Sequence, residues 1–279
     1  MIRTSVVLAL LGLGCAASLP ASVKDRPAFT QFNPSGTWAV PGPALRWKDP
    51  TIPVAMTLDH GRQTFDVAVG AADPHEAIVK GHALVDGDWL YTLTSDDLPA
   101  TVLFVYDVGA EQMDGVRATK VLGYQRAVRK DKAPGDPVAG SWNVSGIRSD
   151  GGNYKAELVV AKVGDHYSLT STDGSSTFEG VAFLVGSKLV GCTVTSVSVK
   201  THTTMVTPAL GAAVEIRKST TSREHTAHFV LGAYRADGNL LRGQSLYGSN
   251  EQAEKDREQE HLVSAEWSRG ATAGAEAHP

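Results

Sequence analysis

The amino-acid sequence predicts an all-β protein built from two tandem antiparallel up-and-down β-barrels. Three observations lead to this prediction. The chain of 279 residues contains 28 Gly and 13 Pro, a turn-rich composition. Its apolar residues alternate with polar ones in short runs, as half-buried strands require. The tripeptide Gly-Thr-Trp at 36–38 recurs as Gly-Ser-Trp at 140–142, and the segments that follow share further anchors in the same order. Two β-sandwich domains have the same number of strands and remain the alternative fold.

Residues 1–21 are predicted to be a cleaved secretory signal peptide. Arg3 supplies a positive charge, and an apolar core of about eight residues follows, too short for the roughly 20 that a membrane span needs. We therefore expect a secreted or periplasmic protein that does not span the membrane. Cys15 follows the apolar core as it does in bacterial lipoprotein signals, so a lipid anchor at the cell envelope is the alternative.

The first barrel domain is predicted over 34–128. Its first strand begins at Gly36, and a proline-rich loop around Trp47 follows, since proline disrupts strand interiors. Alternating runs at 54–58, 64–69 and 77–85 are the next strands. Asp86-Gly87 then marks a hairpin turn, and strands at 89–94, 101–108 and 116–128 complete the domain.

A polar linker with two prolines is predicted over 129–138, before a second barrel domain over 139–248. The turn glycines 87 and 186 lie 99 positions apart, whereas Tyr106 and Tyr234 lie 128 apart. An extra hairpin inserted at about 195–228 explains the difference. Ser249 can begin a short charged helix, and the rest of the segment 249–279 is predicted to be a disordered tail.

A Gly-x-Trp at the start of a first strand, followed by about seven short antiparallel strands, resembles the calycin group of β-barrels (lipocalins, avidins and bacterial envelope relatives). In that group a basic residue on the last strand often lies across the tryptophan. The resemblance therefore implies that Arg117 and Arg242 lie against Trp38 and Trp142 at the barrel ends. An eight-stranded barrel is filled by side chains or holds one small ligand. The aromatic residues expected to fill the interiors are Trp38, Phe65, Trp89, Phe104, Trp142, Phe183 and Phe229.

Composition and motifs exclude several classes of function. A net charge of −4 without a stripe of Lys and Arg argues against nucleic-acid binding. The sequence has no Gly-x-Ser-x-Gly, Gly-x-Gly-x-x-Gly or phosphate-binding loop. His202, His225 and His228 lack the spacing of a metal site, and Cys192 is the only cysteine after the signal. We therefore expect no catalytic residue, no metal and no cofactor, and a protein that is not an enzyme.

Three hypotheses for function remain. The first is an exported, non-enzymatic binding protein that holds a small apolar ligand in one barrel. The second is a structural or protein-interaction module of the cell envelope, with both barrels filled and a protein as partner. The third is a hydrolase or inhibitor without a recognisable motif. For the first two, the candidate contact residues are Trp47, Trp89 and Phe183. The second hypothesis places the contact surface on the inserted hairpin (197–217) or on the proline-rich loop around Trp47, since an exposed tryptophan is a common anchor in interfaces.

Overall fold

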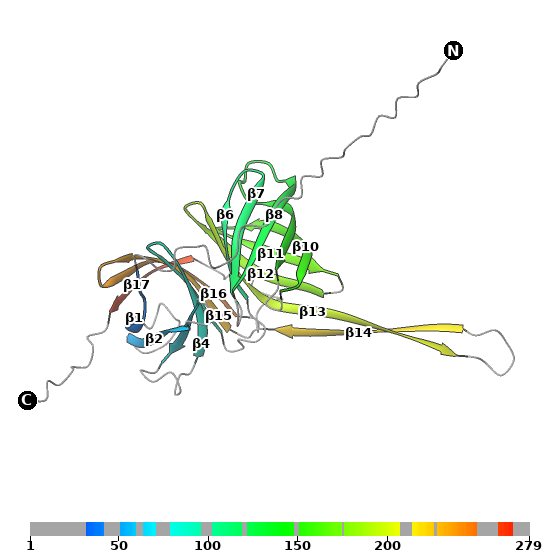
Figure 1. Cartoon of the computed structure of the whole chain (residues 1–279), viewed down its shortest axis with the longest axis horizontal. Coiled ribbons are helices and arrows are strands. Elements are labelled where there is room, and N and C mark those ends of the chain that lie inside the picture. Colours follow the sequence, from blue (N-terminus) through cyan, green and yellow to red (C-terminus); the bar gives the residue numbers. More distant parts are fainter. Residues whose placement is uncertain are drawn as a thin grey trace, which may run out of the picture.

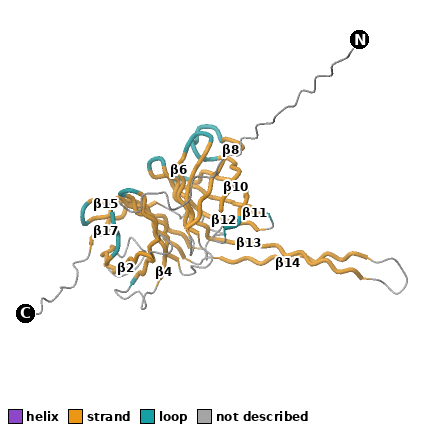
Figure 2. The backbone as a smooth tube through the Cα atoms, in the orientation of Figure 1, coloured by secondary structure: helices purple, strands orange, loops and turns teal. Residues whose placement is uncertain are grey.

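The computed structural model describes residues 32–41, 51–59, 64–70, 79–95, 102–118, 122–147, 151–174, 176–206, 214–225, 228–249 and 262–269. Every regular element in these ranges is a β-strand, and the strands close into two antiparallel eight-stranded barrels. Figures 1 and 2 show the two barrels side by side, with a long hairpin leaving one of them. The predicted all-β fold of two barrels is confirmed.

Barrel 1 closes in the order β1-β17-β16-β15-β5-β4-β3-β2. Its strands are β1 (Gly36–Pro41), β2 (Thr51–Asp59), β3 (Thr64–Val69), β4 (Val79–Asp86), β5 (Trp89–Ser95), β15 (His228–Asp237), β16 (Leu240–Ser249) and β17 (Leu262–Arg269). The barrel therefore joins two segments that lie far apart in the sequence.

Barrel 2 comprises β6 to β13, with β12 and β13 closing the ring, and β14 adds to β13 outside it. The strands are β6 (Val102–Val108), β7 (Gln112–Ala118), β8 (Leu122–Lys132), β9 (Gly140–Ile147), β10 (Asn153–Val163), β11 (His166–Asp173), β12 (Ser176–Val185), β13 (Lys188–Val206) and β14 (Val214–His225). Barrel 2 thus lies within one continuous stretch of the chain.

The two sequence repeats exchange their last three strands. We call β1 to β8 unit 1 and β9 to β17 unit 2. In unit 1, β5 leads along the chain to β6 but pairs with β15, where Leu90 faces Tyr234. In unit 2, β13 pairs with β6, where Leu189 faces Tyr106. Leu90 and Leu189 are 99 positions apart and the tyrosines 128 apart. In each barrel, the fifth strand of one unit therefore pairs with the first of the last three strands of the other unit, in the same register.

This exchange corrects the predicted division of the chain. Each barrel takes strands from both predicted domains, 34–128 and 139–248, because the last three strands of one unit fit the ladder of the other. Two boundaries also differ. β8 continues to Lys132, inside the predicted linker, and Leu262–Arg269 is strand β17 and not part of a helix. Ala265 and Trp267 are buried between exposed neighbours, the alternation of a strand.

Each barrel interior is packed with the chain's own side chains. In barrel 1 the largest of these belong to Trp38, Phe65, Tyr234 and Trp267, each at most 2% exposed. In barrel 2 the interior cluster includes Phe104, Tyr106, Trp142, Tyr154 and Tyr167. This packing agrees with the narrow bore of an eight-stranded barrel.

A third apolar cluster joins the outer faces of the two barrels, and we call it the seam. Successive residues in a strand point to opposite faces. Leu90 packs inside barrel 1, whereas Tyr91 and Leu93, one and three positions later, belong to the seam. The buried members from barrel 1 are Leu84, Tyr91, Leu93, Phe229, Leu231, Ala233 and Leu246. Those from barrel 2 are Leu103, Val105, Val116, Ala118, Tyr124, Val181, Phe183, Val190 and Cys192.

The two units contribute equivalent positions to the seam. Pairs that lie 99 positions apart are Leu84 with Phe183, Tyr91 with Val190, and Leu93 with Cys192. Pairs that lie 128 apart are Leu103 with Leu231, Val105 with Ala233, and Ala118 with Leu246. A two-fold symmetric dimer uses the same patch of both subunits in this way. The seam is therefore a nearly symmetric interface between the two barrels of a single chain.

The outer part of β13 and the whole of β14 form an arm that leaves the barrels. The two strands pair from Thr195 with His225 to Val206 with Val214, in the segment where the sequence predicts an inserted hairpin. Figure 1 shows the arm extending away from both barrels. Among the described strands, β14 pairs with β13 alone, so one of its edges carries backbone groups without a strand partner.

Candidate functional site

The clearest side-chain constellation is a tryptophan–arginine pair at one end of each barrel. In barrel 1, the Trp38 indole Nε1 donates a hydrogen bond to the carbonyl oxygen of Pro34 at 2.8 Å. The Cζ atom of Arg269 on β17 lies 5.1 Å from the centre of the Trp38 ring system. Arg269 Nη2 also donates to the carbonyl oxygens of Asn33 and Ser35, at 2.8 and 3.1 Å. The arginine thus ties the last strand to the chain that enters the first.

Barrel 2 repeats this arrangement with a closer arginine. Trp142 Nε1 donates to the carbonyl oxygen of Val138 at 2.9 Å, four residues earlier as in barrel 1. Arg129 Cζ on β8 lies 4.0 Å from the centre of the Trp142 ring system. Its Nε donates to the carbonyl oxygen of Ala110 at 2.7 Å, and its Nη2 to that of Pro137 at 2.5 Å. The guanidinium therefore combines a cation–π contact with hydrogen bonds to backbone.

The predicted arginines, Arg117 and Arg242, are in other places. Arg242 is exposed on the outside of β16 and forms ion pairs with Glu266 at 2.6 Å and Asp237 at 3.0 Å. Arg117 lies inside barrel 2 over the ring of Tyr154. The sequence interpretation ended each unit too early, so the end of β8 after residue 128 and the whole of β17 were missed. Their signal is that both arginines follow a buried inward residue by two positions, Ala127 in β8 and Trp267 in β17.

The aromatic residues proposed as ligand or partner contacts pack in the seam instead. Phe183 is fully buried there, and Trp89 is partly buried with its ring stacked on Tyr91 at a centroid distance of 6.4 Å. Phe229 also belongs to the seam, so these three rings do not fill barrel interiors as predicted. The four rings of Trp38, Phe65, Phe104 and Trp142 do lie inside the barrels. Trp47 lies outside the described residues.

Polar contacts link the two barrels at the rims of the seam. The Lys188 ammonium on β13 lies 2.5 Å from a carboxylate oxygen of Asp86 in barrel 1 and 2.6 Å from one of Asp107. Burial lowers the pKa of Lys188, but hydrogen bonds to the two carboxylates outweigh burial and raise it overall. The lysine therefore remains charged and bridges the barrels.

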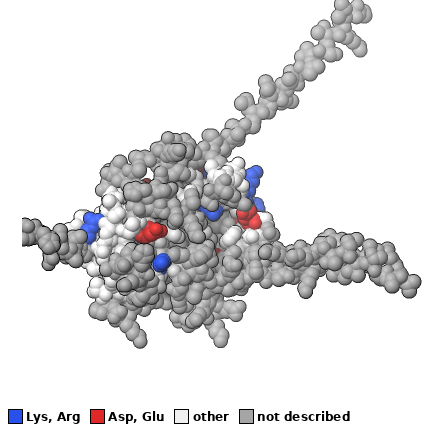
Figure 3. All heavy atoms as spheres, turned by 60° about the horizontal axis from the view of Figure 1, so that its bottom comes forward, with Lys and Arg blue, Asp and Glu red and all other residues white. Residues whose placement is uncertain are grey.

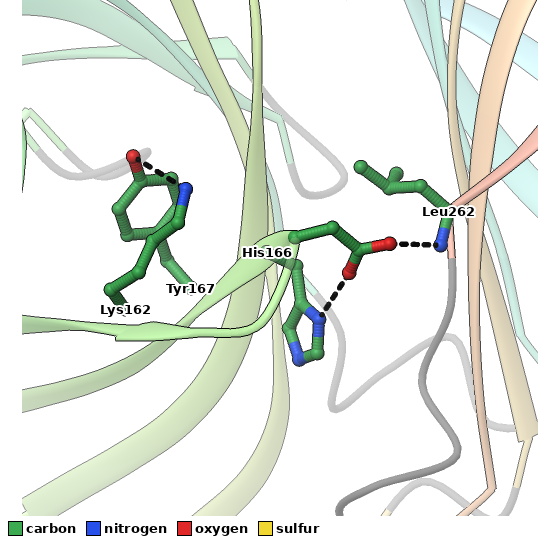
Figure 4. Close-up of polar contacts among 5 residues, drawn as sticks. Lys162, His166, Tyr167 and Leu262 are labelled. Atoms are coloured by element: carbon green, nitrogen blue, oxygen red, sulfur yellow. Dashed lines mark hydrogen bonds and ion pairs between the residues drawn. The ribbon is translucent and has the colours of Figure 1, made fainter.

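A second link involves the turn between β10 and β11, shown in Figure 4. One carboxylate oxygen of Asp165 lies 3.1 Å from Nδ1 of His166, and the other accepts a hydrogen bond from the backbone nitrogen of Leu262 at 3.3 Å. Burial raises the pKa of Asp165, but these bonds outweigh it and lower the pKa below its ordinary value. Asp165 thus holds the beginning of β17, which belongs to barrel 1, against barrel 2.

The end of barrel 2 opposite Trp142 contains a polar cluster that the sequence interpretation missed. Arg117 Cζ lies 5.2 Å from the centre of the Tyr154 ring, and the Tyr154 hydroxyl donates to Oε1 of Gln125 at 2.6 Å. Gln125 and Tyr154 are 6% and 8% exposed. The alternation around Met113 and Ala127, both interior, places Arg117 and Gln125 on the inner face.

In the described ranges there is no group of three His, Cys, Asp or Glu residues that is placed to hold a metal ion. Figure 3 shows basic and acidic side chains scattered in small groups of both signs over one face. None of the described segments is a helix long and apolar enough to cross a bilayer.

Comparisons with protein-family models, with characterised proteins and with solved structures each found no match to this chain.

Proposed function

We propose that this chain is an exported, non-enzymatic interaction module that recruits a partner protein of the cell envelope through its β13–β14 arm. The partner supplies an extended segment, which adds as a strand to the open edge of β14. Recognition of this kind uses backbone hydrogen bonds along the edge.

The observation that carries the proposal is the arm itself. β13 pairs with β12 only as far as Ser198 and with β6 only as far as Thr193, so beyond them it pairs with β14 alone. The arm therefore presents two strand edges outside the barrels. Natural proteins usually shorten or cover such edges because they promote pairing with other chains. An edge of this length is consistent with a role in binding.

The barrel interiors favour the same conclusion. Barrel 1 is occupied by four large aromatic side chains of its own, and barrel 2 by five. A carrier of a bulky apolar ligand needs a cavity lined by such groups and not filled by them. The small apolar ligand that the calycin resemblance implies stays a prediction. Native mass spectrometry of protein isolated from its host checks it, through an adduct that is lost on denaturation.

The experiment uses the full chain and a shortened-arm variant. Val199 and Thr221 are partners in the ladder, so replacing residues 200–220 by Asn-Gly joins them through a two-residue hairpin turn. A photo-crosslinker is placed at position 220 on the arm and, as a matched control, at the exposed Lys155 on barrel 2. We expect one envelope protein to be crosslinked at position 220 and not at position 155.

The crosslinked segment is then made as a peptide and titrated onto the protein. Strand addition predicts slower hydrogen exchange of the β14 amides on binding, because edge N–H groups become bonded. The shortened-arm variant is expected to have the same melting temperature as the wild type and to bind no peptide. Equal crosslinking at positions 155 and 220, or peptide binding that survives removal of the arm, contradicts the proposal.

A further inference from the structure

Arg117 is a cation inside barrel 2 that has no acidic partner among the described residues. It lies on the inner face of β7, partly exposed at the end of barrel 2, with its guanidinium over the ring of Tyr154. Neither an ion pair nor a hydrogen bond to a carboxylate of the described residues involves it. Partial burial without a counter-ion leaves part of the lost hydration of the guanidinium uncompensated.

The surroundings of Arg117 are built to receive its side chain. A Cβ atom at Gly123 would lie 3.2 Å from Cγ of Arg117, and one at Gly146 would lie 2.5 Å from the ring of Tyr154. Glycine at these two positions therefore leaves room for the arginine and the tyrosine. The Tyr154 hydroxyl is fixed by its hydrogen bond to Gln125, whose amide group has N–H donors and lies on the same inner face of the barrel as Arg117.

The cation is not needed to close a barrel of this type. The position equivalent to Arg117 in barrel 1, 128 residues later, is Ser245. There the Ser245 Oγ lies 2.6 Å from the hydroxyl of Tyr234, the equivalent of Tyr106. Barrel 1 thus pairs its interior tyrosine with a neutral hydroxyl. In barrel 2 burial raises the pKa of Tyr106, and the nearby charge of Arg117 opposes this.

We propose that the end of barrel 2 is a binding site for a small organic carboxylate, held by Arg117 with the Gln125 amide and the Tyr154 ring beside it. A single guanidinium supplies one positive charge and a planar pair of donors, which match a carboxylate in charge and in geometry. The partly exposed position of Arg117 gives a solute access. The inference is independent of the proposed role of the arm, which lies on other strands.

The test is calorimetric titration of the full chain with benzoate and with hexanoate at neutral pH, with inorganic phosphate as the competing class of anion. We expect saturable binding of a carboxylate with one site per chain. Arg117→Gln and Arg117→Lys are expected to weaken binding about thirtyfold or more, because they remove the bidentate pair.

Arg242→Gln is the matched control, because it removes the same charge from the outside of barrel 1. It is expected to leave carboxylate binding unchanged. The charge-preserving Arg117→Lys keeps the test valid if Arg117→Gln does not fold. No saturable binding up to about 10 mM, phosphate binding tighter than carboxylate, or equal losses in the variants at positions 117 and 242 would each overturn the proposal.

Discussion

Barrel 1 and barrel 2 share a backbone plan but differ in the polar groups inside it. In both, a tryptophan donates a hydrogen bond to a carbonyl oxygen four residues earlier, and an arginine from the neighbouring strand lies over its ring. In both, glycine faces the interior tyrosine, Gly243 opposite Tyr234 and Gly115 opposite Tyr106. A Cβ at either glycine would collide with the backbone of the neighbouring strand. The shared glycines therefore allow neighbouring strands to approach closely in both barrels, while the interior polar groups have diverged.

The chain entering each first strand shows the same divergence. In barrel 1, Phe32 packs edge-on against Trp38 with ring centroids 6.2 Å apart. The position 104 residues later is Asp136, whose Oδ1 accepts hydrogen bonds from the backbone nitrogens of Val138 and Ala139, both at 2.8 Å. The Tyr167 hydroxyl donates to Asp136 Oδ2 at 3.1 Å. One barrel end is closed by apolar packing and the other by a hydrogen-bonded carboxylate.

The largest effect is expected from cutting the chain between the units. A protease site inserted between Pro134 and Gly135, in the exposed turn before β9, allows a cut without loss of a strand. Because each barrel holds strands of both fragments, the fragments should stay together and separate only on unfolding. With an effective concentration of about 1 mM for the linked units, the cut costs about 4 kcal/mol at a protein concentration of about 1 μM.

Denaturant titration at several protein concentrations measures this effect. The midpoint of the cut protein should rise with concentration, whereas that of the uncut insertion protein should not. Two barrels that each contained a single unit would instead give fragments whose midpoints are independent of concentration, and the strand exchange would be wrong.

Truncation of the two tryptophans compares the barrel cores directly. Trp38 and Trp142 are both fully buried, so Trp38→Ala and Trp142→Ala should each lower the free energy of unfolding by about 3–5 kcal/mol. Because the seam and the exchanged strands couple the barrels, each variant should unfold in one transition, monitored by far-ultraviolet circular dichroism. Persistence of one barrel after the other has melted would show that they are not coupled.

Removal of the two arginines should distinguish the barrel ends. Arg129 lies closer to its indole than Arg269 does, 4.0 against 5.1 Å. We expect Arg129→Ala to cost about 2 kcal/mol and Arg269→Ala about 1 kcal/mol of unfolding free energy. Arg242→Ala, on an exposed surface, should leave the free energy of unfolding almost unchanged. Chemical denaturation provides the values, and a larger loss at position 242 than at 129 would contradict the assignment.

The smallest effect concerns pH and barrel 2 alone. Burial raises the pKa of Asp136, but bonds from Ala139, Val138 and Tyr167 outweigh burial and lower it below the ordinary 3.8. A lowered pKa in the folded state contributes stability above about pH 4, which is lost as the pH falls through the folded value. Thermal melts between about pH 7 and pH 3 should therefore converge for wild type and Asp136→Asn, with the wild type more stable at pH 7. Parallel curves would show that Asp136 does not contribute through its charge.

Much of the fold could be predicted from the sequence because local patterns determine it. The Gly-x-Trp repeat, the Asp86-Gly87 turn and the alternating runs all mark strands that the structure contains. The match of Tyr106 with Tyr234 was also sound, since each tyrosine faces a glycine at the same register, Gly115 and Gly243. The exchange of strands could not be predicted, because the last three strands of either unit can form the same backbone pairing with the fifth strand of either unit. The sequence alone does not choose between these two arrangements. The β17 strand was missed because only two of its side chains are buried.

The candidate sites were harder to predict than the fold. Trp38 and Trp142 follow from a motif, but their arginines lie in segments that the sequence interpretation assigned to the linker (129–138) and to the charged helix and tail (249–279). Arg117 was singled out for a contact with a tryptophan that it does not make, since it lies over Tyr154 instead. Trp89 and Phe183 satisfy the pattern of interior residues equally well, since alternation identifies two faces and does not say which is inside. Only the pairing of the strands assigns Phe183 to the seam.

The exchange of strands has a consequence for how the protein acquires its structure. Barrel 2 occupies one continuous stretch, 102–206, and can close as soon as that stretch is available. Barrel 1 cannot, since the hydrogen bond between Arg269 and the carbonyl of Asn33 spans 236 residues. Contacts across such separations form late and slowly. The first five strands therefore cannot close into a barrel until nearly the whole chain has been synthesised. By then barrel 2 has already folded, and barrel 1 is completed against its seam.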